Sequence, residues 1–250
     1  MARRIWQRGV EIELLHRSMG FAALGLVTLI PLLIVVAAAL GQNNGQGFVT
    51  WVRDALGVTG NSARAVETLF STPASVLSTT TALSLASLAV FGLSFVAAIQ
   101  TAYERIWDLP SAPWHATWRR ALALAVLVAY LLVAEYSDHV LQGTALQPTI
   151  SFVVTGGGGM AFFWWLQSFL LCGRVPRSFL LPGAVATVLG LVGLRFFSVT
   201  VFSPLIASSA VSYGPIGTVL IVQSWLIGVG FVIYAGALAG QGLRDRKHSS

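Results

Sequence analysis

The chain has few charged residues, one cysteine and almost no lysine. Charged residues make up 10% of its 250 residues, against 56% hydrophobic ones, whereas a soluble domain normally carries about a quarter charged residues. A chain of this length with so few charges cannot cover a core with a hydrated surface, so we expect lipid around it. Its single cysteine, Cys172, excludes an intrachain disulfide and a cysteine metal cluster.

The scarcity of lysine and the lack of catalytic motifs argue against several enzyme classes. Four glycines at positions 156–159 would suit a phosphate-binding loop, but such a loop needs a Lys-Ser or Lys-Thr pair after them. Met160 and two phenylalanines follow instead, and the first lysine is Lys247. Neither an HExxH zinc motif nor a GxSxG nucleophile turn occurs. We therefore expect no enzyme, no cofactor and no metal site.

Long apolar runs dominate what remains. A bilayer core of roughly 30 Å requires about 20 apolar residues in a helix, and none of these runs alternates as an outer-membrane strand would. The sequence therefore predicts an all-α, polytopic membrane protein that forms one domain with six transmembrane helices. The predicted spans are Met19 to Leu40, Leu77 to Ala98, Trp118 to Glu135, Val153 to Cys172, Leu180 to Phe202 and Ile216 to Ala239.

The arginines predict the orientation of these spans. They precede the first span, lie between spans two and three and between spans four and five, and follow the sixth. The connections on the opposite side carry only Arg53 and Arg64. Because arginine and lysine accumulate in cytoplasmic loops, we expect both termini in the cytoplasm.

Two connecting segments have amphipathic patterns. Residues 1–18 mix apolar residues with arginines, which predicts a short helix on the cytoplasmic surface beside anionic headgroups. The outer loop 41–76 repeats apolar residues from Phe48 to Leu56 at helical spacing. Asn61 is suited to cap a second short helix that runs to Phe70. We expect two small helices on the outer face and no separate soluble domain.

One basic residue lies well inside a predicted span. Arg195 is about fifteen residues into the fifth span, roughly 22 Å from its cytoplasmic edge at about 1.5 Å per residue. Glu135 reaches a similar depth in the third span. Charges inside a membrane are costly and often functional, so we predict that the two pair or border one water-filled cavity. The alternatives are a structural salt bridge and an arginine that reaches the outer headgroups.

Small hydroxyl residues recur on one face of the second span, and buried amides accompany them. Such a stripe serves helix packing or lines a polar pathway. The stripe consists of Thr80, Ser84, Ser87 and Ser94, and the amides are Gln167 in the fourth span and Gln223 in the sixth. The pair Gly236 and Gly240 forms a GxxxG pattern, which favours close helix packing.

Several stretches in the order found here resemble the YihY/BrkB family of bacterial inner-membrane proteins. The most specific is the Tyr213-Gly-Pro-Ile-Gly217 segment, which is expected to form a turn before the sixth span. Arg195 falls where the family tends to carry Lys or Arg, whereas Glu104 departs from a more amide-like residue. The matching stretches, which together reach from about Met19 to Ala239, are "LVTLIPLLIVVAAAL", "AYERIWDLP", "RVPRSFLLPGAVAT" and "SSAVSYGPIGTVLIVQSWL".

The resemblance implies six helices, both ends in the cytoplasm and a place in the bacterial inner membrane. It suggests a transporter or flippase for an amphipathic or anionic envelope molecule, such as a lipid or lipopolysaccharide precursor. Arg195 would attract the anionic group, the hydroxyl stripe and Gln223 would line the route, and Tyr213, Gly214 and Gly217 would form a flexible entrance. The alternative is a non-transporting organiser of envelope lipids or proteins. We expect membrane lipids as partners and no nucleic acid; the sequence specifies no oligomeric state.

Overall fold

The computed structural model is built from helices. It describes residues 2–39, 53, 58, 60–70, 81–112, 117–141 and 156–248, and no strand occurs among them, which confirms the all-α prediction. The elements are α1 (Ala2–Glu11), α2 (Leu14–Ala39), α4 (Gly60–Phe70), α6 (Thr81–Ile106), α7 (Thr117–Leu141), α9 (Gly158–Leu170), α10 (Arg177–Phe197), the π-helix η3 (Ser198–Phe202) and α11 (Ser203–His248).

Four helices are long and apolar enough to cross a membrane. Within the described residues these candidate spans are Leu14–Leu32, Leu83–Ile106, Arg177–Ile206 and Ile216–Arg244. They coincide with the predicted spans one, two, five and six, although the second continues through Ile106 rather than ending at Ala98. The helical composition and these spans identify an integral membrane protein.

The predicted third and fourth spans are not among those four. The third, Trp118 to Glu135, lies within α7. The fourth corresponds to α9, which has 13 residues and so measures about 20 Å at roughly 1.5 Å per residue, less than the roughly 30 Å bilayer core. Residues 153–155 of that predicted span lie outside the described part. A count of six crossings therefore stays a prediction.

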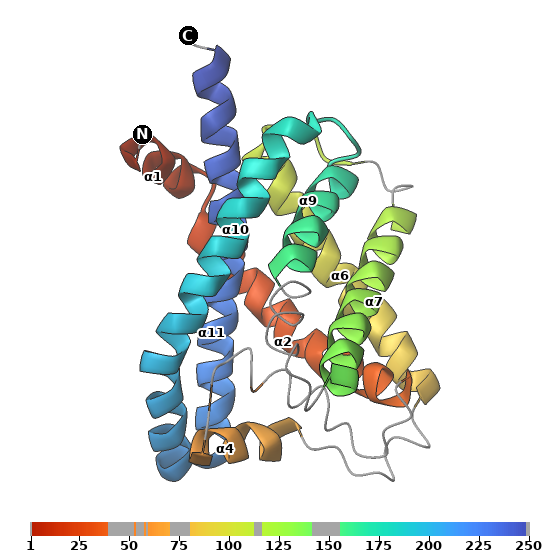
Figure 1. Cartoon of the computed structure of the whole chain (residues 1–250), viewed down its shortest axis with the longest axis vertical. Helices are drawn as coiled ribbons and strands as arrows, with labels where there is room; N and C mark the ends of the chain where they lie inside the picture. Colours follow the sequence, from red (N-terminus) through yellow and green to blue (C-terminus); the bar gives the residue numbers. More distant parts are fainter. Residues whose placement is uncertain are drawn as a thin grey trace.

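Figure 1 shows both chain ends at the same end of the bundle, together with α1 and the connection from α9 to α10. This end is called the terminal end below. The short helix α4 lies at the opposite end, where it packs against α11, and it occupies the place where a helix from Asn61 to Phe70 was expected. The other expected outer helix, from Phe48 to Leu56, falls outside the described residues apart from Arg53. Termini on one side agree with an even number of crossings.

Helices α10 and α11 form the most extensive helix pair of the described structure. The chain runs along α10 away from the terminal end and returns along α11 (Figure 1). Their backbones touch at glycines: a Cβ on Gly240 would lie 3.1 Å from the Cα of Gly183, and one on Gly236 would lie 2.8 Å from the backbone nitrogen of Thr187. Glycine has no Cβ, so the two helices approach more closely than larger residues would allow.

We expect Gly236→Ala to lower stability by about 1–3 kcal/mol, because the added methyl meets backbone that cannot rotate away. Gly193→Ala is the matched control. Gly193 lies on α10 with nothing within 4 Å of an added Cβ, so alanine there should be neutral or stabilising by roughly 0.5–1 kcal/mol. Thermal unfolding of both variants in the same detergent tests the contact. Equal stability of the two variants would mean that the helices do not pack through Gly236.

Candidate functional site

A buried carboxylate organises the terminal end. Glu104 lies in the last turn of α6, with 5% of its side chain exposed. Its Oε1 accepts hydrogen bonds from the Arg174 Nη2 (2.7 Å), the backbone nitrogen of Ala112 (3.0 Å) and the Gln100 Nε2 (3.2 Å). A carboxylate removed from water is tolerated only when it is paired and hydrogen-bonded in this way.

The partners of Glu104 come from separate parts of the chain. Arg174 lies in the connection from α9 to α10, where Cys172 (φ 56°) and Gly173 (φ 68°) have left-handed backbones that reverse the chain. Arg174 also donates to the carbonyls of Pro110 (2.6 Å) and Leu171 (3.0 Å). From α7, the Arg120 Nε donates to the Gln100 Oε1 at 2.8 Å. The network thus joins α6, α7 and the α9–α10 connection.

A second set of polar contacts attaches α1 and α11 to the end of α6. Arg8 of α1 forms ion pairs with Asp108 and Glu11, and the Gln241 Nε2 of α11 donates to the Asp108 Oδ2 at 3.4 Å. Burial lowers the pKa of the Arg8 guanidinium, but its hydrogen bonds to the two carboxylates outweigh this effect and leave the pKa raised. Arg8 therefore stays charged and the contact persists across the physiological pH range.

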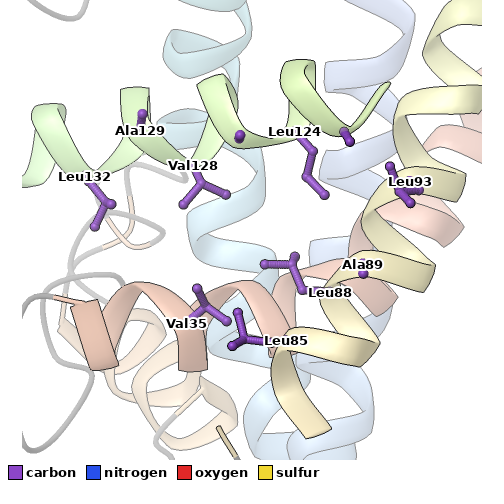
Figure 2. Close-up of a pocket in the computed structure, with 11 residues that line it drawn as sticks. Val35, Leu85, Leu88, Ala89, Leu93, Leu124, Val128, Ala129 and Leu132 are labelled. Atoms are coloured by element: carbon purple, nitrogen blue, oxygen red, sulfur yellow. The ribbon is translucent and has the colours of Figure 1, made fainter. Parts of the chain in front are cut away.

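An apolar groove follows the seam between α6 and α7 (Figure 2). Its volume of about 380 Å³ lies within the range of small-molecule pockets, roughly 300–1,000 Å³. Figure 2 shows Leu124, Val128 and Leu132 of α7 pointing toward Leu88 of α6 and Val35 of α2. The lining consists of Val35, Leu85, Leu88, Ala89, Leu93, Ala121, Leu124, Ala125, Val128, Ala129 and Leu132. With no polar side chain among them, the groove suits a hydrocarbon chain and offers no group for catalysis.

Small residues keep this groove open to its surroundings. Ala89, Ala121, Ala125 and Ala129 are all exposed although they line the hollow. The two helices are in close contact at Gly92, where an added Cβ would lie 2.7 Å from the Leu124 side chain. The hydrogen bond from Arg120 to Gln100 joins the same two helices nearer the terminal end. Within the described part of the chain, the groove is therefore open along these alanines.

The residues predicted to form a polar pathway do not gather at this groove. Ser84 is buried, Ser87 is half-buried, and Ser94 is exposed and donates to the carbonyl of Val90 at 2.8 Å. Thr80 lies outside the described residues. The Gln223 amide faces α2, with its nitrogen 3.3 Å from the Ala22 carbonyl oxygen and its oxygen 3.2 Å from the Ala23 nitrogen. No sequence pattern indicated that this amide would join α11 to α2.

The predicted pair of charges lies on helices with different main packing partners. Arg195 is an exposed residue in the last turn of α10, which packs chiefly on α11 and α9. Glu135 lies in α7, which packs chiefly on α6 and α9, and its side chain is outside the described part. Neither residue lines the groove. Their pairing stays a prediction.

The expected turn at Tyr213 to Gly217 is wrong, because α11 is helical from Ser203 to His248. The chain instead reverses around η3 and the first part of α11 (Figure 1). If the helix ended at proline or glycine inside a membrane, several backbone N–H and C=O groups would lack hydrogen bonds. The helix therefore continues through these residues, and neighbouring groups bond the few backbone atoms that they free. Tyr213, Gly214 and Gly217 therefore lie in a helix rather than in a turn, and Gly217 is buried; their part in a substrate pathway stays a prediction.

The candidate spans and these contacts define a helical integral membrane protein with an apolar groove between α6 and α7. A family model described as Virulence factor BrkB matches residues 5–249. The chain therefore belongs to the YihY/BrkB family, as the sequence motifs predicted. No curated protein and no solved structure matches it significantly. Among the described residues, no three His, Cys, Asp or Glu side chains come together as metal ligands.

Sequence reasoning missed the role of Glu104. It treated Arg120 and Arg174 as markers of orientation and Glu104 as a departure from the family pattern. The available signal was the position of one carboxylate at the end of a span, in a chain whose arginines occupy the same ends. A carboxylate among arginines at one membrane face is expected to find a guanidinium partner, although Asp108 shares this face and the sequence does not show which of the two acids is buried.

We expect Glu104→Ala to destabilise the protein by about 3 kcal/mol, because Arg174 and the Gln100 amide lose their shared acceptor. Glu104→Gln retains a side-chain oxygen at the same place and should cost less than half as much. The thermal unfolding of the two variants, followed by intrinsic fluorescence in detergent, tests this ranking. Equal losses would show that the acceptor geometry is unimportant.

Proposed function

We propose that the protein binds an amphipathic envelope molecule, such as an anionic lipid or lipopolysaccharide precursor, and moves it across the membrane. The observation that carries this proposal is the groove between α6 and α7, whose lining is entirely apolar and whose alanines are exposed. A lipid in the bilayer can place an acyl chain there without passing through water.

The arrangement of the helices supports movement at the groove. The network around Glu104 and the bond from Arg120 to Gln100 hold α6 and α7 together at the terminal end. The side chains that line the groove are all apolar, so a separation of α6 from α7 there would break no hydrogen bond between lining side chains. The sequence has no ATP-binding motif, so movement would be passive or driven by a gradient or a partner protein.

A second candidate function is a non-transporting organiser that holds envelope lipids or partner proteins. The close backbone packing of α10 on α11 at Gly183, Gly236 and Gly240 favours it. Arg195 is exposed, and neither the groove nor a second hollow at the terminal end is lined by Arg195 or the hydroxyl stripe. An organiser would retain lipid through purification but leave its rate of translocation unchanged.

Filling the groove tests transport. Ala125→Trp and Ala89→Trp place an indole in the hollow, and we expect each to slow the translocation of a fluorescent phospholipid in proteoliposomes by about tenfold. Val90→Trp is the control, since Val90 is 62% exposed on α6 and does not line the groove. The measurement is the fraction of lipid that dithionite quenches over time. Wild-type protein no faster than empty liposomes would favour the organiser, whereas unchanged rates in both groove variants would exclude this route.

Charge reversal tests the predicted pair of Arg195 and Glu135. If the two residues attract each other, Arg195→Glu and Glu135→Arg should each reduce stability, and the double variant should recover at least half of the combined loss. Thermal unfolding in lipid nanodiscs measures the three variants. A double variant no more stable than either single variant would end the pairing hypothesis.

A further inference from the structure

A second hollow, of different character, lies at the terminal end between α7, α9 and the start of α10. Its volume is about 480 Å³, and it is lined by Arg119, Trp165, Ser168, Phe169, Cys172 and Arg177 among others. The groove of α6 and α7 is apolar, whereas this hollow, called the basic pocket below, combines two guanidinium groups with a hydroxyl and aromatic rings. The proposed transport function makes no use of it.

Arg119 is held in position with part of its guanidinium unoccupied. Its Nη1 donates to the carbonyl of Phe169 at 3.2 Å, and its guanidinium carbon lies 5.2 Å from the centre of the Trp118 ring and 5.4 Å from that of Phe169. Contact with two ring faces orients the cation and leaves further N–H groups to donate. Among the described side chains, Arg119 forms no ion pair with a carboxylate.

Arg177 adds a second positive charge at the first turn of α10. It is exposed and also forms no ion pair within the described part of the chain. The helix begins after Pro176, which provides no side-chain cap for the first backbone N–H groups. Those N–H groups form the positive end of a 21-residue helix. Like the two guanidinium groups, they attract negative charge. Among the described residues, the basic pocket therefore combines two guanidinium groups with the positive end of a helix, all of which would attract an anion.

The surroundings of the basic pocket indicate that the anion belongs to a lipid. The pocket lies at the end of α10, a candidate membrane span, which places it at the depth of the headgroups. Trp118, 57% exposed, and Leu122, 42% exposed, follow one another on α7 beside Arg119. Tryptophan is enriched at this depth, and these apolar side chains continue from the pocket toward the membrane interior. A soluble phosphate would need no such surface.

We propose that the basic pocket binds the phosphate of an anionic phospholipid, with Arg119 and Arg177 as its guanidinium partners. Arginine can donate two parallel hydrogen bonds to phosphate oxygens, and the Ser168 hydroxyl lies in the same lining. The site concerns binding at equilibrium and goes beyond the proposed function. It can be occupied whether or not any lipid is moved, and loss of binding would leave the groove proposal intact.

The chain contains its own reporter for this site, because its single cysteine, Cys172, lines the basic pocket. We would reconstitute the protein in nanodiscs of phosphatidylcholine with or without phosphatidylglycerol. Two readouts are the phosphatidylglycerol molecules retained in native mass spectrometry and the rate at which N-ethylmaleimide alkylates Cys172. For the wild type we expect preferential retention of phosphatidylglycerol and at least threefold slower alkylation in its presence.

Arg177→Gln and Arg119→Gln should each reduce both effects, and the double variant should abolish them. Arg105→Gln is the matched control, because Arg105 is an exposed arginine in the last turn of α6 and lies outside the basic pocket. Since Arg177 is exposed, its substitution should leave the fold intact even if loss of Arg119 does not. The proposal is overturned if Arg105→Gln reduces retention as much as Arg177→Gln, which would indicate diffuse surface charge. It is also overturned if sn-glycerol 3-phosphate protects Cys172 as well as the lipid does, which would indicate a soluble phosphate ligand.

Discussion

In an apolar environment the backbone has no water to bond with, and this constraint shapes every described element of the protein. Each segment must satisfy its own N–H and C=O groups, so the described spans are helices. Helices already surrounded by lipid gain little from hiding apolar side chains against one another, so their association depends on how closely their surfaces fit. The glycine contacts between α10 and α11 are the clearest result. They make α11 a fixed element against which α2, α6 and α4 also pack.

Polar interactions are concentrated where this constraint relaxes, at the terminal end. Glu104, Arg174, Gln100 and Arg120 form a network there, and Asp108 attaches α1 and α11 nearby. Ion pairs near a membrane surface specify which helix ends meet, even where the free energy they contribute is modest. The described helices are therefore joined by several directional bonds at the terminal end, whereas α10 and α11 meet chiefly through close packing at glycines.

The groove between α6 and α7 and the basic pocket differ in the side chains that line them: the first is apolar, and the second carries two arginines. The groove between α6 and α7 is lined by apolar side chains, which match hydrocarbon chains. The basic pocket lies at the terminal end and carries Arg119 and Arg177, which match phosphate groups. An amphipathic lipid has both kinds of surface. The proposed lipid binding would therefore use separate places for the two parts of such molecules.

The sequence by itself determined the class of the protein, its helical content, its family and four of its candidate spans. These depend on composition, on the length of apolar runs and on short motifs, all of which are local. It misplaced the turn at Tyr213 to Gly217, because glycine and proline signal a turn in water and are tolerated inside a helix in lipid. Only the tertiary structure placed Glu104 beside Arg174, seventy positions away, and Arg119 against Phe169. Such contacts depend on the angles at which helices cross, which arise from packing over the whole bundle and leave no periodic trace in the sequence.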